Sequence, residues 1–409
     1  MQQNLVSEND ISVLDSVQFL VGDALLVKRM TRIPVLEPFS DLVVDYLNMV
    51  SKSLLASSEA KAYPDIVTFA FWIRKAHLTE LKRKFVDKDG DIHVGRGITF
   101  HIAPSNVAVN YAYSMVAGLL TGNACIVRVP SKEFPQVRII NDVLNACLRT
   151  FEDVKPYVCL VQYGHDKAVN DWFSQIADVR VIWGGDATIS EIRQSPIRPR
   201  TVEITFADRY SLAVIDSDVY MNLEKKKAFA QDFYNDTYLS DQNACTSPSV
   251  LIWLGTKKEE AKQLFWEYEH KLVKEKYQFQ PIMGINKLTN SYLAAIGLEK
   301  AELIDMGDNY ITRMHVNNVD ASLMQWKSHS GFFFEYDCDD IMEIRNLCDN
   351  THCQTIGYLG DRKNLTKLLL SGIKGVDRIV PIGKTMDFEL IWDGYNIMEC
   401  LTRTIRVGI

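Results

Sequence analysis

The residue whose surroundings best suit covalent chemistry is Cys245. It lies among small polar residues in the segment Leu239–Pro248 (LSDQNACTSP), directly before the apolar run Val250–Leu254. A structural cysteine usually replaces alanine or valine inside an apolar run, as Cys125 and Cys159 do here. A cysteine on a polar loop is where a nucleophilic thiolate would be placed. Composition alone leaves an inert thiol open as the alternative.

A second segment, Ile102–Asn106 (IAPSN), joins the end of an apolar run to a proline turn and an amide side chain. Further along, Gly122–Lys132 (GNACIVRVPSK) contains an apolar run that ends at the basic residue Arg128. The combination of Pro-x-Asn with a Gly-Asn strand that ends in a basic residue resembles the aldehyde dehydrogenase superfamily.

Within that superfamily, four segments resemble the LuxC-type acyl-CoA reductases, the fatty acid reductases of bacterial luminescence operons and their non-luminescent relatives. These segments are Asn123–Lys132, Ala207–Ile215, Asp241–Pro248 and Trp392–Gly394. The resemblance runs in order over roughly residues 85–409. It implies an α/β protein of aldehyde dehydrogenase-like fold, with a cofactor-binding parallel-sheet domain, a second α/β catalytic domain and a small oligomerisation ribbon.

The resemblance also implies roles for two residues. Cys245 matches the nucleophile that holds the acyl group as a thioester, which NADPH then reduces to the aldehyde. Asn106 matches the amide that, with the backbone N–H of Cys245, stabilises the tetrahedral oxyanion, and one such donor is worth ~3–4 kcal/mol of barrier. The acyl donor would be acyl-CoA or an acyl-carrying partner protein, such as an acyl-protein synthetase or transferase, as for an acyl-protein thioester reductase.

The same resemblance places the cofactor in the turns that follow successive strands. Arg128 falls where the superfamily has a basic residue against the adenosine ribose, and Ser131 and Lys132 lie just beyond it. Two cations complement a 2′-phosphate, so we expect NADPH rather than NADH. A glycine turn matches the approach to the pyrophosphate. The predicted cofactor-binding residues are Pro104, Ser105, Arg128, Ser131, Lys132, Gly164, Gly184, Gly185 and Asp186.

One departure from the superfamily concerns the base that activates water. Aldehyde-oxidising relatives carry Glu-Leu-Gly-Gly, but Thr201–Asp208 reads TVEITFAD, with Glu203 two positions out of register. Glu203 is therefore a candidate base, and a weakened base fits an acyl reductase because water would destroy the thioester. Two alternatives stay open: a cysteine-dependent acyltransferase or thioesterase on the same fold, and a non-catalytic α/β binding protein.

The composition excludes several classes of protein. The 409 residues carry a net charge of −7 without a long basic run, which argues against a nucleic-acid binder. Eight cysteines indicate a reducing compartment, and neither they nor the histidines have the spacing of metal ligands. Ile102–Val127 has no charged residue, but Thr121–Asn123 divides it with a turn. We therefore expect a soluble, cytoplasmic protein without a metal or a membrane span.

The elements that must position these residues follow from alternating apolar and helical stretches, which indicate a parallel sheet covered on both faces. Ligands of such sheets bind beyond the carboxyl ends of the strands. The predicted strands of the first sheet are Ile98–Ile102, Ala124–Val129, Tyr157–Gln162, Val179–Trp183 and Leu212–Ile215. Helices are predicted near residues 41–54 and 64–84, and a last strand over Leu401–Val407.

We expect an NADP-binding domain over residues 1–216, a catalytic domain carrying Cys245 over 217–385, and a C-terminal segment over 386–409 that returns to the first domain. A hairpin around Asp89-Gly90, within residues 85–97, would form the oligomerisation ribbon. Unpaired strand edges can be covered by another subunit, so we expect a homodimer or homotetramer.

Overall fold

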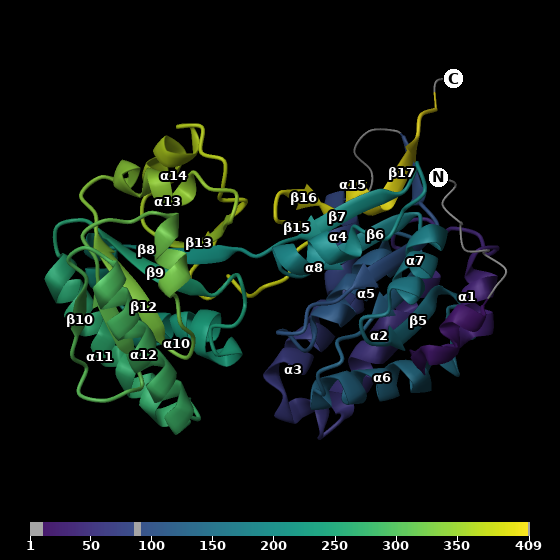
Figure 1. Ribbon diagram of the computed structural model, residues 1–409, viewed down its shortest axis with the longest axis horizontal. Helices are drawn as coiled ribbons and strands as arrows, with labels where there is room; N and C mark the ends of the chain where they lie inside the picture. Colours follow the sequence, from purple (N-terminus) through teal and green to yellow (C-terminus); the bar gives the residue numbers. More distant parts are fainter. Residues whose placement is uncertain (1–10, 86–90, 408–409) are drawn as a thin grey trace. The chain divides into compact units, whose positions relative to one another are not determined.

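The computed structural model describes residues 11–85 and 91–407, which form two compact units (Figure 1). Unit 1 comprises residues 1–207 and 395–409, and unit 2 comprises residues 208–394. Each boundary lies nine residues from its predicted position (207 against 216, and 394 against 385). The chain thus leaves unit 1 once and returns to it at the C-terminus.

Unit 1 is built on a six-stranded sheet with the order β1-β5-β4-β3-β6-β7. β1 is antiparallel to β5, and all other neighbours are parallel. The predicted strands over 98–102 and 179–183 are confirmed at both ends. The strands are β1 (Gln18–Val21), β3 (Ile98–Ile102), β4 (Ala124–Arg128), β5 (Val158–Gln162), β6 (Val179–Trp183) and β7 (Val202–Phe206).

The helices of unit 1 confirm the predicted helix that begins at Asp41, but the single helix predicted over 64–84 is wrong. The amides of Ile73 and Arg74 close a tight turn, and Asn48 Oδ1 then accepts the amide of Lys75 at 3.2 Å. A new helix therefore begins at that residue. The helices are α1 (Ala24–Met30), α2 (Asp41–Ala56), α3 (Pro64–Trp72), α4 (Lys75–Phe85), α5 (Asn110–Leu120), α6 (Pro135–Leu148), α7 (Lys167–Ile176), α8 (Asp186–Ile192) and α15 (Ile397–Leu401).

Unit 2 is built on a seven-stranded sheet with the order β10-β11-β12-β9-β8-β13-β14, in which only β10 is antiparallel to its neighbour. The strands are β8 (Tyr210–Asp216), β9 (Pro248–Leu254), β10 (Glu302–Ile304), β11 (Thr312–His315), β12 (Phe332–Asp337), β13 (Cys353–Leu359) and β14 (Arg378–Pro381). The helices are α9 (Ser217–Met221), α10 (Lys226–Thr237), α11 (Lys258–Lys276), α12 (Pro281–Gly297), α13 (Arg345–Cys348) and α14 (Arg362–Leu369). The predicted class, two α/β units with largely parallel sheets, is confirmed.

The assignment of Leu212–Ile215 to the first sheet is wrong, because β8 lies between β9 and β13 in unit 2. The place we gave it is taken by β7, an edge strand. The half-buried Glu203 and Thr205 interrupt the apolar pattern of β7. An apolar run therefore predicts a strand with neighbours on both sides, but not the sheet to which the strand belongs.

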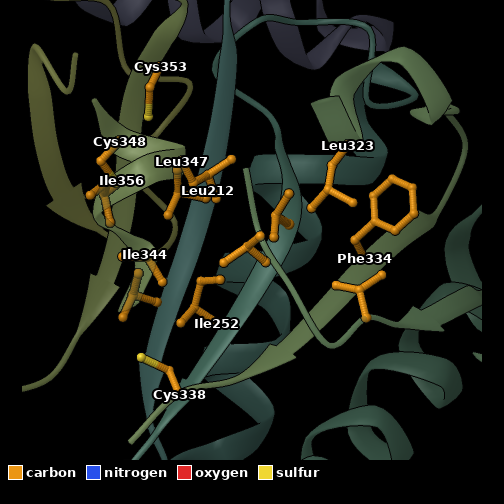
Figure 2. Packing of buried hydrophobic residues seen from close by; sticks show 14 of the residues in the cluster. Leu212, Ile252, Leu323, Phe334, Cys338, Ile344, Leu347, Cys348, Cys353 and Ile356 are labelled. Atoms are coloured by element: carbon orange, nitrogen blue, oxygen red, sulfur yellow. The ribbon is translucent and has the colours of Figure 1, made fainter. Parts of the chain in front are cut away.

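Two apolar clusters lie on opposite faces of the sheet in unit 2. Successive residues of a strand point to opposite faces, and Leu212 and Ile252 belong to one cluster while Ala213 and Leu251 belong to the other. The first cluster, shown in Figure 2, also contains three buried cysteines. Its labelled members are Leu212, Ile252, Leu323, Phe334, Cys338, Ile344, Leu347, Cys348, Cys353 and Ile356.

A two-stranded antiparallel ribbon in unit 1 pairs β2 (Ile92–Gly95) with β17 (Thr402–Ile405). The predicted turn at Asp89-Gly90 lies outside the described residues. Phe85, expected in the first strand of that hairpin, ends α4 instead, where the preceding basic residues suit a helix C-terminus. The last strand of the chain is confirmed over residues 402–405.

Within residues 11–85 and 91–407, no helix has both the length and the apolar character needed to cross a membrane. The uncharged segment 102–127 comprises the end of β3, helix α5 and most of β4.

Asn123 ties the ribbon to the first sheet. Its Oδ1 accepts from the amides of Arg96 (2.7 Å) and Gly97 (3.1 Å), and its Nδ2 donates to the carbonyl of Leu401 (2.9 Å). We expect Asn123→Ala to lower the free energy of unfolding by about 3 kcal/mol, because each buried group left unpaired costs about 1–3 kcal/mol. Urea unfolding followed by circular dichroism measures this loss.

The matched control is Asn48→Ala, which removes one exposed bond and should cost about 1 kcal/mol or less. An Asn123→Ala variant no less stable than this control would contradict the tie between ribbon and sheet.

Candidate active site

Cys245 lies in a loop that is anchored at the amino end of β9. Asp241 and Gln242 adopt left-handed backbone conformations (φ 52° and 55°), which turn the chain sharply. The buried side chain of Gln242 then holds the loop: its Oε1 accepts the amide of Gly331 at 2.7 Å, and its Nε2 donates to the carbonyl of Pro248 at 3.0 Å. These bonds fix the loop to both β12 and β9.

As a residue Cys245 is half-buried, whereas six of the eight cysteines are buried. Ser211 of β8 donates its hydroxyl to the carbonyl of Cys245 at 2.8 Å. Burial, followed by the charge of Asp393, raises the pKa of this thiol to about 11, although a hydrogen bond from Gln354 and the charge of Arg209 act to lower it. The thiol is therefore protonated at neutral pH.

Polar side chains lie with Cys245 at the amino edge of this sheet. Gln354, the second residue of β13, donates Nε2 to Oδ1 of Asp393. Arg209, directly before β8, donates to Oδ2 of Asp377 at 2.5 Å. Burial raises the pKa of Asp393 to about 6. Sequence reasoning gave these residues no role, although Arg209 and Asp393 lie in two of the segments that resemble the LuxC-type reductases, Ala207–Ile215 and Trp392–Gly394.

The predicted cofactor residues meet at the carboxyl edge of the first sheet. Because β3, β4, β5 and β6 run parallel, the turns that follow them gather at one edge. Arg128 is the last residue of β4. The others follow the strands in turn: Pro104 and Ser105 after β3, Ser131 and Lys132 after β4, Gly164 after β5, and Gly184, Gly185 and Asp186 after β6. Their binding of a cofactor stays a prediction.

The side chains at this edge fit a dinucleotide cofactor. The guanidinium of Arg128 donates to the carbonyl of Gly164 at 2.9 Å and stacks over the ring of Tyr163, 4.6 Å from its centre. Lys132 is exposed, with Nζ 4.9 Å from the centre of the Phe134 ring. A Cβ atom added at Gly164 would meet nothing within 4 Å. Cations beside open backbone suit phosphate and ribose groups.

Asn106 is exposed in the loop between β3 and α5 of unit 1, whereas Cys245 belongs to unit 2. The joint oxyanion role of the two residues stays a prediction.

Glu203 fits the role of a base poorly. Its carboxylate accepts hydrogen bonds from Arg193 Nε at 2.7 Å and from the guanidinium of Arg180. Partial burial acts to raise the pKa of Glu203, but the bonds from Arg193 and Arg180 outweigh it, and the pKa is lowered. A carboxylate held ionised in two ion pairs is a weak proton acceptor. The interpretation of Glu203 as a catalytic residue is therefore not retained.

In the described part of the chain, no group of three or more His, Cys, Asp or Glu side chains could hold a metal ion. His352, which lies near two cysteines in the sequence, places its Nδ1 2.5 Å from the carbonyl of Asp208, and both cysteines are buried in the core.

The chain is similar in sequence to a known family of reductases. The family described as Acyl-CoA reductase (LuxC) matches residues 79–302, more than half of the chain. The long-chain acyl-protein thioester reductases of Photorhabdus luminescens and Vibrio harveyi are 25% and 28% identical to it over 308 and 324 residues. These alignments cover 72% and 76% of this chain, and 60% and 63% of the relatives. The chain thus spans less than two thirds of their length.

Among solved structures, the indole-3-acetaldehyde dehydrogenase of P. syringae in complex with NAD+ has a TM-score of 0.65 at 11% identity. The alignment covers 89% of this chain and 82% of that chain. At this identity the likeness shows the fold alone, and it confirms the predicted aldehyde dehydrogenase-like fold.

Alkylation of Cys245 by iodoacetamide should accelerate about tenfold per pH unit between about pH 7 and 9.5, because only the thiolate reacts and the pKa lies near 11. Mass spectrometry of peptides measures the labelling of each cysteine. Cys125, whose pKa burial raises to about 12, is the internal control and should stay unlabelled in the folded protein. A plateau in the Cys245 rate below pH 8 would show that the thiol is already ionised.

Proposed function

The chain belongs to the acyl-CoA reductase (LuxC) family, and on that premise we propose that it reduces an activated acyl thioester to an aldehyde through an acyl group held on Cys245. The observation that carries the proposal is the place of this residue: a half-buried cysteine on a polar loop, fixed at the amino end of β9. Six of the other seven cysteines are buried, where an acyl donor cannot reach them.

The first step is a thiol–thioester exchange. The sulfur of Cys245 bonds to the acyl carbon, the bond between that carbon and the donor sulfur breaks, and the proton of Cys245 leaves with the donor thiol. One thioester replaces another, so the exchange is nearly isoenergetic. The raised pKa of Cys245 makes loss of its proton the demanding part of the step.

We assign the oxyanion of the tetrahedral intermediate to two donors, the backbone N–H of Cys245 and the side-chain amide of Asn106. The exposed position of Asn106 after β3 and its match to the Pro-x-Asn pattern support this assignment. After reduction, the hemithioacetal oxygen loses its proton and the bond from carbon to the Cys245 sulfur breaks. The aldehyde leaves and the electron pair returns to sulfur.

NADPH, when bound, supplies the hydride for this reduction. We propose that the carboxyl edge of the first sheet holds it, with Arg128 and Lys132 beside the 2′-phosphate and Gly184–Asp186 at the pyrophosphate. Arg128 is a rigid cation, because the Tyr163 ring and the Gly164 carbonyl already orient it. Small residues in the other turns leave the backbone accessible to phosphate oxygens.

The acyl donor in this proposal is a long acyl chain carried by a protein, since the relatives are named long-chain acyl-protein thioester reductases. An acyl-protein synthetase or transferase could present it, and acyl-CoA is the alternative donor. The pairing of Glu203 with two arginines disfavours a thioesterase, which needs a carboxylate able to activate water.

Acylation without NADPH should give one adduct, on Cys245. Intact-protein mass spectrometry after mixing with acyl-CoA measures it, and Cys245→Ser should abolish it while cofactor binding is kept. Asn106→Ala should still acylate, but about 100-fold more slowly, as expected for one lost oxyanion donor. Cys400→Ser, at the other half-buried cysteine, is the control. An adduct mapped to any other cysteine would overturn the proposal.

Arg128→Ala should raise the KM for NADPH much more than the KM for NADH, because the lost cation complements the 2′-phosphate. Steady-state oxidation of both cofactors measures the ratio. Lys167→Ala, at an exposed lysine on α7, should change neither KM. Equal effects of Arg128→Ala on the two cofactors would refute the preference.

We also propose a homodimer or homotetramer that assembles through the β2–β17 ribbon, whose strands pair with each other. Light scattering should show loss of assembly or of solubility when the chain ends before Glu399. A full-length protein that stays monomeric at micromolar concentration would contradict this assembly.

A further inference from the structure

Gln354 lies beside the residue that anchors Cys245. β13 pairs in parallel with β8, with Cys353 opposite Tyr210. Gln354 is therefore on the strand next to Ser211, whose hydroxyl holds the carbonyl of Cys245 at 2.8 Å. The side chain of Gln354 is 1% exposed and carries an amide into the amino edge of the sheet. A buried amide needs hydrogen-bond partners, and the partners of Gln354 indicate what its side chain does.

The orientation of this amide is fixed by Asp393. Nε2 of Gln354 donates to Oδ1 of Asp393, whereas Oε1 has no partner among the described residues. A carboxylate can only accept hydrogen bonds, so the nitrogen and not the oxygen must face Asp393. The same nitrogen carries a second N–H that Asp393 does not use. A hydrogen bond from the Gln354 side chain acts to lower the pKa of the Cys245 thiol.

Asp393 is itself held by its surroundings. Asp393 and Gly394 both have left-handed backbone conformations (φ 49° and 75°). A Cβ atom at Gly394 would lie 3.0 Å from Oδ1 of Asp377, so glycine permits this close approach. Asp377 donates its amide to the carbonyl of Gln354 at 2.9 Å and accepts from Arg209 at 2.5 Å. The turn, the amide and the arginine form one connected network.

We propose that Gln354 is a catalytic residue that donates a hydrogen bond from its side-chain nitrogen to the sulfur of Cys245, and that Asp393 is the positioning residue that keeps this nitrogen facing the sulfur. The inference rests on the proposed function. The sulfur bears negative charge when it loses its proton, and again when the hemithioacetal bond breaks and the electron pair returns to it. A donor already in place stabilises both states.

Other charged groups at the amino edge of the sheet also act on the sulfur of Cys245. Asp393 opposes a negative sulfur and Arg209 favours it. Asp377 and Arg378 act on Asp393 in turn. Loss of the Gln354 amide should therefore lower the reactivity of the thiol, whereas a substitution of Asp393 both removes an opposing charge and can release the amide. Two Asp393 variants that lose the same charge but differ in their acceptor separate these effects.

The test compares Gln354→Met with Thr355→Val, both buried in β13. Methionine has the length of glutamine but no N–H, so alkylation of Cys245 by iodoacetamide at pH 8 should slow about tenfold, the usual effect of one hydrogen bond to a charged group. The apparent pKa of the thiol should rise while the melting temperature stays within a few degrees. Thr355→Val should alkylate at the wild-type rate. A Gln354→Met variant that alkylates as fast as the wild type would overturn the proposal.

Two variants of Asp393 test its positioning role independently of Gln354→Met. Asp393→Asn and Asp393→Ala remove the same charge, but only asparagine keeps an acceptor for Nε2, and asparagine tolerates the left-handed backbone. Asp393→Asn should therefore alkylate several-fold faster than Asp393→Ala, and equal rates would overturn the positioning role. Acyl labelling of the wild type is a separate readout: its absence would refute the proposed function, while alkylation would still decide the role of Gln354.

Discussion

Parallel strands present all their like ends at one edge of a sheet, and the chemistry of both units depends on this constraint. In unit 1 the turns after β3, β4, β5 and β6 meet at the carboxyl edge and bring Arg128 together with the glycine turns. In unit 2 Cys245, Gln354 and Arg209 each lie at or just before the start of a strand, so they meet at the amino edge. Reversing one strand of five residues would move its end by about 16 Å and remove its residue from the group.

This constraint also explains which parts of the fold could be predicted from the sequence. The strands over 98–102 and 179–183 are central strands with neighbours on both sides, so every residue is buried. Apolar residues predominate in both, although Thr99, His101 and Arg180 are buried among them. β7 lies at an edge and carries Glu203, whose charge is neutralised by arginines that the local pattern does not reveal. The partner of β2 is more than 300 residues away along the chain, and no local signal indicates it.

The residues of the candidate sites also fall into those that the sequence could predict and those that it could not. Cys245 and Arg128 stand out because each contrasts with its immediate neighbours. Cys245 lies on a polar loop before an apolar strand, and Arg128 is a cation at the end of an apolar strand. The sequence assigns no role to Gln354 or to Asp393, which lies in a segment noted only for its resemblance, because that role depends on a contact between residues 39 positions apart. A buried amide is recognised as functional only when its acceptor is known, and the acceptor follows from tertiary structure.

The electrostatics of Cys245 explain why such a contact matters for a residue that, in the proposed function, must both attack and leave. A thiol with a high pKa gives a strongly nucleophilic thiolate but a poor leaving group. Burial and Asp393 move Cys245 in that direction, to a pKa of about 11. A hydrogen-bond donor to the sulfur stabilises the negative charge of the thiolate and so offsets the free-energy cost of forming it. Because the donor is a neutral amide, it adds no net charge to the site. Asp393, with a pKa of about 6, is mainly ionised at neutral pH and can only accept from Gln354. As the pH falls through that value, Asp393 gains a proton and loses the negative charge that opposes a thiolate at Cys245, while its carbonyl oxygen can still accept from the amide.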